Sequence, residues 1–287
     1  MCCFLSRFTP LAALMLTIML FTSPSMAEKT AAAPAKAEAE TAAQPTATTA
    51  DKPKQPIEIE ADQQLEWLRN QSMYRGTGNI TITQGDTIIR GDYAEAHYDG
   101  AIGPSALTTM TVKGNVTITN KDRVIRGDQG AYDTRTEIMI VTGQNVTLTT
   151  PTMSAKANER MEYHAAANKA IAKGKAEVTQ PGQKIKAETI TAFFHPDTSA
   201  LERAHAVGNV FITKQQANGV DIAQSHQADY DVKKDSVELK GNVKLTRGDN
   251  HMQGNHAVID LKTGYSTLKN TGGKSNGRVR AVFNTGN

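Results

Sequence analysis

Hydrophobic and polar residues alternate one by one in short stretches that recur from residue 57 onward. In the stretch VTIT at 116–119, apolar Val and Ile alternate with Thr. Successive side chains of a β-strand point to opposite faces, so this spacing of two predicts a strand with one buried face. Val, Ile and Thr also pack well on a pleated surface. No stretch after residue 56 shows a sustained helical stripe, and the pattern therefore predicts an all-β fold.

A short phrase that begins with glycine returns along the chain with a period of about 33 residues. Ankyrin and tetratricopeptide arrays share this period, but the alternation inside each copy favours strands. The leading glycine predicts a turn, bend or bulge where a side chain would clash. The copies are GNITIT (78–83), GNVTIT (114–119), GQNVTLT (143–149), GKAEVT (174–179), GNVFIT (208–213) and GNVKLT (241–246).

A second phrase, a small residue followed by a polar one, comes after each copy of the first. The carboxylates among its polar residues could suggest the acid pair of a glycosidase. Other copies have Asn or His at the same place, which favours a turn or a ladder of polar side chains. The dipeptides are Gly91-Asp92, Gly127-Asp128, Ala157-Asn158, Ala187-Glu188, Ser225-His226 and Gly254-Asn255.

Strands that repeat in this way predict an elongated pair of sheets or a solenoid, in which each repeat contacts only its neighbours. The stretch 153–173 is rich in Ala, Glu and Met, which favour helix. We still predict strands there because it keeps the register of the other copies. A partial copy at 57–76 and a closing strand at 278–283 are expected to act as caps or docking edges.

Composition supports a thin interior rather than a filled globule. The chain has 287 residues, of which 39% are hydrophobic and only 5% aromatic, so it has few large side chains to fill a wide core. The interior is therefore expected to be a narrow slot lined by small and branched apolar side chains. The formal net charge of +3 is too small for wholesale phosphate neutralisation, which argues against a nucleic-acid partner.

The sequence contains no recognisable catalytic, metal-binding or phosphate-binding motif. His251 and His256 are five residues apart, which on a strand would place them on opposite faces and argues against a shared metal. There is no serine nucleophile signature, phosphate loop or cysteine cluster. The sequence therefore predicts no catalytic residues, no metal site, no cofactor and no enzymatic activity.

The first 27 residues have the features of an export signal. Arg7 supplies a positive region, 11–21 is an apolar run too short to span a bilayer, and Ser25-Met26-Ala27 matches a cleavage site. We predict a signal peptide over 1–27, with a retained membrane anchor as the alternative. The chain's two cysteines both lie in this segment, so the mature chain would have none, which fits a bacterial periplasm without disulfides.

Residues 28–56 are rich in Ala, Pro and Thr, and this composition predicts a disordered linker.

The export signal, the cysteine-free mature chain and the tandem GNVxIT phrases resemble the OstA-like family of lipopolysaccharide transport proteins. The stretches GNVKLTRGDNHMQGNHAVIDLKTG (241–264) and GRVRAVF (277–283) resemble the end of that domain most closely. The resemblance covers 57–287, which we predict as one OstA-like repeat domain. It implies an elongated, open, V-shaped β-jelly roll whose edge strands join head to tail with sister domains.

The resemblance also implies a function in the periplasm of a Gram-negative bacterium. The protein would be a non-enzymatic carrier or bridge that moves lipopolysaccharide from the inner to the outer membrane, with the acyl chains of lipid A in an apolar groove. The implied partners are lipopolysaccharide, an inner-membrane-anchored and an outer-membrane OstA-like protein, and further copies of the chain in a head-to-tail homo-oligomer. The alternative is a secreted β-solenoid enzyme or adhesin that acts on polysaccharide.

The alternating apolar residues of the phrases are the groove candidates. Each of them could fill the core, contact lipid, or do both. They are Ile80, Ile82, Val116, Ile118, Val146, Leu148, Val178, Val210, Ile212, Val243 and Leu245. A set of basic residues could meet lipid phosphates or could simply be solvated: Lys113, Arg126, Lys240, Arg247, Arg278 and Arg280.

Overall fold

The computed structural model describes residues 56–216, 219–270 and 278–283. The predicted signal peptide and all but the last residue of the predicted linker lie outside these residues. Within them, the chain consists of β-strands and one short 3-10 turn, η2 (Arg69–Gln71). No helix in this part of the chain is long and apolar enough to span a membrane.

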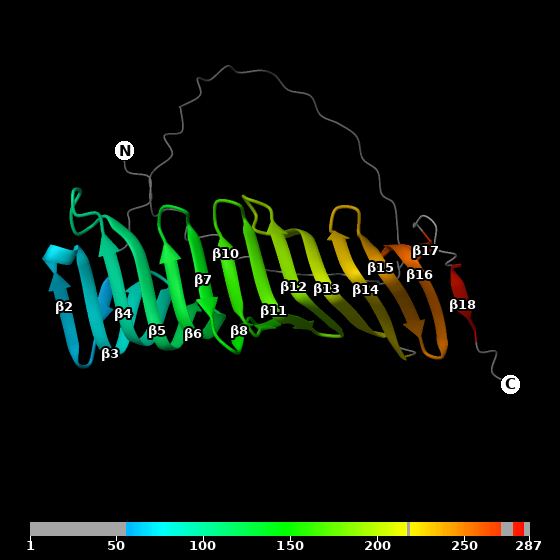
Figure 1. Cartoon of the computed structure of the whole chain (residues 1–287), viewed down its shortest axis with the longest axis horizontal. Coiled ribbons are helices and arrows are strands. Elements are labelled where there is room, and N and C mark those ends of the chain that lie inside the picture. The colour runs from blue at the N-terminus through cyan, green and yellow to red at the C-terminus, as the bar shows by residue number, and fades with distance from the viewer. Residues whose placement is uncertain (1–55, 217–218, 271–277, 284–287) are drawn as a thin grey trace, which may run out of the picture.

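The strands stand side by side in chain order and make an elongated molecule with β2 at one end and β18 at the other (Figure 1). All strand pairs are antiparallel. Their bounds are β1 (Glu58–Glu60), β2 (Gln64–Leu68), β3 (Met73–Gln84), β4 (Thr87–Tyr98), β5 (Leu107–Asn120), β6 (Arg123–Asp133), β7 (Ile138–Thr142), β8 (Val146–Thr149), β9 (Ser154–Ala157), β10 (Arg160–His164), β11 (Lys169–Gln180), β12 (Gln183–Phe194), β13 (Leu201–Gln216), β14 (Gly219–Asp231), β15 (Ser236–Arg247), β16 (Asn250–Asp260), β17 (Ser266–Lys269) and β18 (Arg280–Val282).

Each long strand bends in its middle and contributes to two walls, which together form an open, V-shaped β-jelly roll. The second half of β3 pairs with β1 and its first half pairs with β2. The wall that contains β1, β8, β9 and β18 is called the phrase wall, because the apolar residues of the glycine phrase lie in it. The other wall contains β2, β7, β10 and β17 and is called the opposite wall.

The bend lies at the glycine that begins each phrase. In β3, a β-bulge shifts the register between Thr77 and Ile80. The two residues inside the bulge, Gly78 and Asn79, have φ angles of 80° and 44°, a left-handed conformation that Gly and Asn adopt more readily than other residues. The same pair of positive φ angles recurs in β5, β11, β13 and β15. The predicted bend or bulge at this glycine is therefore confirmed.

The polar residues of the second phrase form a ladder along the line of bends. The Asn115 amide donates a hydrogen bond to Asp92 at 2.9 Å, and the Asn209 amide donates one to Glu188 at 3.4 Å. The Gln144 backbone N–H donates to the Asp128 carboxylate at 3.2 Å. These carboxylates stabilise the neighbouring bends, as the ladder interpretation predicted, and they are not assembled as the acid pair of a glycosidase.

The small residue of the second phrase makes room where the two walls meet. It lies opposite the first apolar residue of a glycine phrase, so a larger side chain faces a small one at the vertex of the V in every copy except the fourth, where Ala176 faces Ala187. At Gly127, an added Cβ would lie 2.5 Å from Val141 Cγ1 in the opposite wall. Three of these cross-strand pairs are Ile80 with Gly91, Val116 with Gly127, and Val243 with Gly254.

Gly127→Ala is expected to lower the free energy of unfolding by about 1–3 kcal/mol, the usual cost of overpacking. The added Cβ would lie 2.5 Å from Val141 Cγ1 and 3.0 Å from the Thr142 carbonyl oxygen. Gly130→Ala, also in β6, is the matched control because its nearest contact would be 3.4 Å. Urea denaturation followed by circular dichroism measures both variants. Equal midpoints would contradict this role of Gly127.

The stretch 153–173 forms strands, as predicted, despite its helix-favouring composition. It contains β9, β10 and the start of β11. β10 pairs with β7 on one side and β11 on the other, so tertiary pairing outweighs the weak local preference of Ala, Glu and Met for helix.

Buried apolar residues form two separate clusters along the molecule. The first lies between β3 and β8 and contains nine buried residues, with Met110, Met139 and Met161 packed against them. The second lies between β12 and β16 and contains Leu239, which has no exposed surface. The core is therefore divided along the length of the V.

Candidate functional site

An unbroken row of apolar side chains runs along the phrase wall from β1 to β18. Each member lies directly opposite the next in the strand register, and directly opposed residues share one face of a sheet. Ile82 and Ile118 of this row are buried between the walls, which places the whole row on the inner face. Its members are Ile59, Ile82, Ile89, Ile118, Ile125, Leu148, Ala155, Val178, Ile185, Ile212, Ala223, Leu245, Met252 and Ala281.

The opposite wall carries a matching row. Many of its members are Gly or Ala, and such small residues leave space between the walls. The row consists of Leu65, Gly76, Ala94, Val112, Gly130, Val141, Met161, Ala172, Ile190, Ala206, Ala228, Leu239, Ala257 and Leu268. The space between the two rows is called the slot.

The eleven groove candidates fall into two sets by their position in the phrase. The first set, one residue nearest each bend, lies at the vertex and is at most 2% exposed: Ile80, Val116, Val146, Val210 and Val243. The second set lies two residues further from the bend and belongs to the apolar row of the phrase wall: Ile82, Ile118, Leu148, Val178, Ile212 and Leu245. The vertex set fills the core, and the row set borders the slot.

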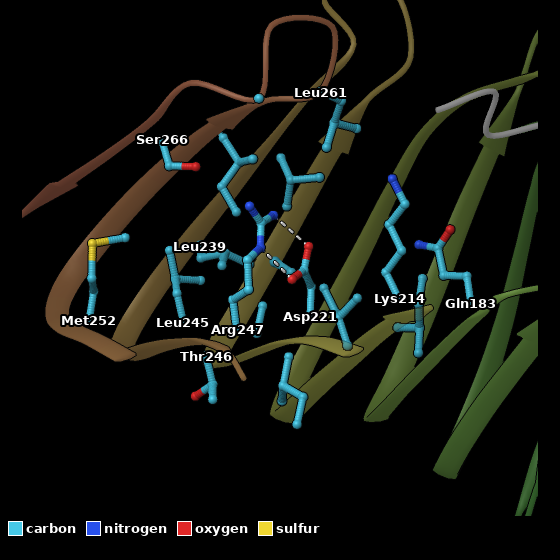
Figure 2. Close-up of a pocket in the computed structure, with 18 of the residues that line it drawn as sticks. Gln183, Lys214, Asp221, Leu239, Leu245, Thr246, Arg247, Met252, Leu261 and Ser266 are labelled. Carbon is cyan, nitrogen blue, oxygen red and sulfur yellow. Dashed lines mark hydrogen bonds and ion pairs between the residues drawn. The ribbon is translucent and has the colours of Figure 1, made fainter. Parts of the chain in front are cut away.

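The slot widens in the second half of the molecule into a cavity of about 510 Å³ (Figure 2). Ile212 and Leu245 of the row set line this cavity, and Ala223 lies between them in the register. A volume of this size is within the range of small-molecule sites, about 300–1,000 Å³. In the first half, Ile82 and Ile118 are only 4% and 6% exposed, and Met110, Met139 and Met161 pack against the core cluster that contains them.

Several residues that line the cavity lie outside the glycine phrases and were not predicted. They lie on the strands that pair with the phrases or in the opposite wall. The period-two alternation of apolar residues in those strands was the signal that could have identified them. The main ones are Ile185, Ile190, Ala223, Leu239, Met252 and Ile259.

A polar row borders the cavity on the phrase wall, two residues beyond the apolar row. Asp221 and Arg247 lie opposite each other on β14 and β15. Arg247 donates two hydrogen bonds of 2.6 Å to the Asp221 carboxylate, as the dashed lines in Figure 2 show. Lys214 and Gln183 continue the row on β13 and β12. The lining thus changes from apolar to charged toward the edge of the wall.

The hydrogen bonds from Arg247 hold the pKa of Asp221 below its ordinary value of 3.8. Because the folded-state pKa is depressed, this ion pair stabilises the fold above the ordinary carboxyl pKa. The contribution is lost as the pH falls through the lower folded-state value. Burial lowers the pKa of Lys214, so the cavity partly desolvates an ammonium group beside the same ion pair.

The other basic candidates are distributed over the outer surface and the C-terminal end. Lys240 makes ion pairs with Glu238 at 3.0 Å and with Asp229 at 3.4 Å, and Lys113 lies over the ring of Tyr93. Arg126 is exposed on β6, while Arg278 and Arg280 are exposed beside or within β18. Arg247 is the only member of this predicted set among the residues that line the cavity. In the part of the chain that the structure describes, no group of three or more His, Cys, Asp or Glu could hold a metal ion.

The bent walls and the two apolar rows define an elongated, open β-jelly-roll protein with an internal slot. A family model, described as LptA/(LptD N-terminal domain) LPS transport protein, matches residues 58–166 and again residues 156–265. The chain therefore belongs to this family of lipopolysaccharide transport proteins.

Comparison with individual proteins adds one solved structure. The chain is 20% identical to the crystal structure of LptH, the LptA homologous periplasmic component of the conserved lipopolysaccharide transport device from Pseudomonas aeruginosa. The match covers 46% of this chain and 94% of that chain, with a TM-score of 0.41. No curated protein matches the chain.

Proposed function

We propose that the protein is a periplasmic carrier that holds the acyl chains of lipopolysaccharide in the slot and passes them from the inner toward the outer membrane. The observation that carries this proposal is the slot between two continuous apolar rows. This slot widens into a cavity that Ile212, Ala223 and Leu245 border. Hiding acyl chains from water is worth about 0.8 kcal/mol per buried CH₂. A slot between two walls can hide the chains while the glycan stays in solvent.

The polar border of the cavity fits the other part of such a ligand. Arg247 and Lys214 lie where the apolar lining ends, at the level where lipid phosphates would meet the protein. Arg247 donates from Nε and Nη2 to Asp221, and its guanidinium has further N–H groups that can donate charge-assisted hydrogen bonds to a phosphate. In this proposal the protein acts by binding alone, without a chemical step. The energy for movement would come from a partner ATPase at the inner membrane.

Assembly completes the proposed path. The edge strands of the chain would pair head to tail with other copies and with the inner-membrane-anchored and outer-membrane proteins of the same family. Adding a strand to a neighbouring sheet supplies main-chain hydrogen bonds. A single continuous slot would then extend over several molecules.

A photo-crosslinking amino acid at Ile212 tests the proposed ligand. We expect benzoylphenylalanine at this position to label lipopolysaccharide in intact cells, because Ile212 lines the cavity. The same probe at Phe211 is the matched control, since Phe211 lies opposite the exposed Gln224 on the outer face of β13. Labelling of neighbouring protein alone at Ile212, or equal lipid labelling at both positions, would contradict the proposal.

A further inference from the structure

The family model matches the chain twice, at residues 58–166 and 156–265, so corresponding positions of the two halves can be compared. The first half contains β1 to β10 and the second half contains β11 to β18. The apolar row of the phrase wall carries branched side chains in both halves, such as Ile118 in the first and Ile212 in the second. The main difference between the halves lies in the opposite wall.

That difference is a second inward-facing row on the opposite wall, two residues further from the bend than the row described above. In the first half, six of its seven members are aromatic or methionine, and the seventh is Ala96. The six are Trp67, Tyr74, Met110, Tyr132, Met139 and Tyr163. The row continues with three small residues before a large side chain returns at Tyr230: Ala170, Ala192 and Ala204. The second half therefore begins with more free space between the walls.

One position of the repeated phrase accounts for most of this change. It lies four residues before the leading glycine, as Met110 lies before Gly114 and Ala204 before Gly208. In the first half this position holds Tyr74, Met110 and Met139, and in the second half it holds Ala170, Ala204 and Val237. The cavity follows the small residues, because Ala204 and Val237 line it and all its lining residues lie between 183 and 283.

The large residues close the slot in the first half. Met110 and Met139 pack against a buried cluster that contains Ile118 and Ile125 of the phrase wall. Ile118 and Ile125 are only 6% and 9% exposed. Ile212 has the place of Ile118 in the second half, and it is partly exposed and lines the cavity. The same position of the phrase is therefore covered in one half and accessible in the other.

The charged rim of the slot differs in the same sense. Burial raises the pKa of Tyr163 on the opposite wall, and the charge of Arg123 on the phrase wall opposes this rise, which places the two groups near each other across the slot. Asp221 has the place of Arg123 in the second half, since both lie four residues before the small residue of the second phrase. Asp221 binds Arg247 on its own wall, so this ion pair does not bridge the slot.

We infer that the two halves of the slot have unequal roles: the second half holds one lipid at rest, and the first half is a gate that a lipid passes only when Met110 and Met139 move aside. This inference rests on the proposed function and adds the resting place and the number of lipids per chain. Methionine is unbranched and has three rotatable bonds, so its side chain adapts readily to a new neighbour. A gate of this kind can open without unfolding of either wall.

A titration tests the number of lipids per chain. Fluorescent lipopolysaccharide is added to the purified chain at a protein concentration well above the dissociation constant, so that the end point gives the stoichiometry. We expect saturation at one lipid per chain, although the family model matches twice. Saturation at two would overturn the inference and leave the proposed function intact. Absence of saturable binding would refute the proposed function, and the inference with it.

An exchange of side chains between the halves tests where that lipid rests. Met110→Ala with Met139→Val gives the first half the residues of the second, and we expect the end point to rise from one lipid to two. Ala204→Met with Val237→Met makes the reverse change. It is expected to weaken binding roughly tenfold, the effect of displacing about two methylenes from the cavity.

Thr191→Met is the control for the exchange, because Thr191 lies opposite His205 on the outer face of the wall and adds the same side chain outside the slot. Circular dichroism checks that each variant is folded, and the Ala204→Met, Val237→Met variant leaves the packing of the first half untouched. An end point of one in a folded Met110→Ala, Met139→Val protein would overturn the inference. Unchanged affinity in the reverse exchange, or an equal loss in Thr191→Met, would do the same.

Stiffer side chains in place of the methionines test the gate itself. Met110→Ile with Met139→Ile keeps a similar volume but replaces flexible side chains with ones that are restricted at χ1. We expect delivery of newly made lipopolysaccharide to the outer leaflet of cells to slow by roughly twofold or more, since opening of a gate can limit an overall rate. The purified variant should still bind one lipid per chain. Delivery at the normal rate would contradict the gate.

Discussion

Ile80→Ala is expected to lower the free energy of unfolding by about 2–5 kcal/mol, the range for truncating a buried isoleucine. Ile80 is 1% exposed at the vertex and belongs to the first core cluster. It lies opposite Gly91, and the backbone there has no side chain that could fill the space left behind. Urea denaturation followed by circular dichroism measures the loss.

Thr81→Ala is the matched control for this prediction. Thr81 follows Ile80 on β3 and points to the outer face, where substitutions usually change stability by about 1 kcal/mol or less. The vertex position of Ile80 also predicts that Ile80→Ala leaves lipid labelling from Ile212 unchanged. A loss of labelling without a loss of stability would contradict the assignment of Ile80 to the core.

Ala223→Phe is expected to weaken lipopolysaccharide binding more than tenfold while the fold is retained. Ala223 lies between Ile212 and Leu245 in the apolar row and lines the cavity, so a phenyl ring there would occupy space proposed for an acyl chain. Displacing roughly three methylenes at about 0.8 kcal/mol each costs about 2.4 kcal/mol, and each 1.4 kcal/mol is a factor of ten in affinity. Binding of fluorescent lipopolysaccharide to the purified protein measures the effect.

Gln224→Phe is the control for the blocked slot. Gln224 is the next residue of β14 and is exposed on the outer face, so it adds the same ring without entering the cavity. We expect its affinity for lipopolysaccharide to stay within about twofold of the unmodified protein. If both phenylalanine variants bind normally, the cavity of the second half is not the lipid site.

The repeated phrases predicted more of the fold than local propensity did. The glycine at the head of the phrase correctly marked a bend, since Gly78 and its equivalents in β5, β11, β13 and β15 have positive φ angles inside β-bulges. The stretch 153–173 shows the limit of propensity, because its residues favour helix and still form strands. Its register relative to the other copies was the better guide, since pairing with β7 and β11 supplies more free energy than the helix preference.

The candidate site was predicted only in part. The sequence identified inward-facing residues but treated the two apolar positions of each phrase alike. Ile212 and Val210 show the difference, as Ile212 lines the cavity whereas Val210 is 2% exposed at the vertex. The distance of a side chain from the bend decides between these roles, and that distance has meaning only once two walls meet there.

The sequence by itself determined the strands, the bends and the family, because alternation, glycine conformation and repeated phrases are local properties of the chain. Only the tertiary structure decided which residues share a row and where the slot widens. Met252 and Ile185 belong to one apolar row although 67 residues separate them. Such a row depends on the register of several strand pairs at once, and each register is set by packing between the walls rather than by the local sequence.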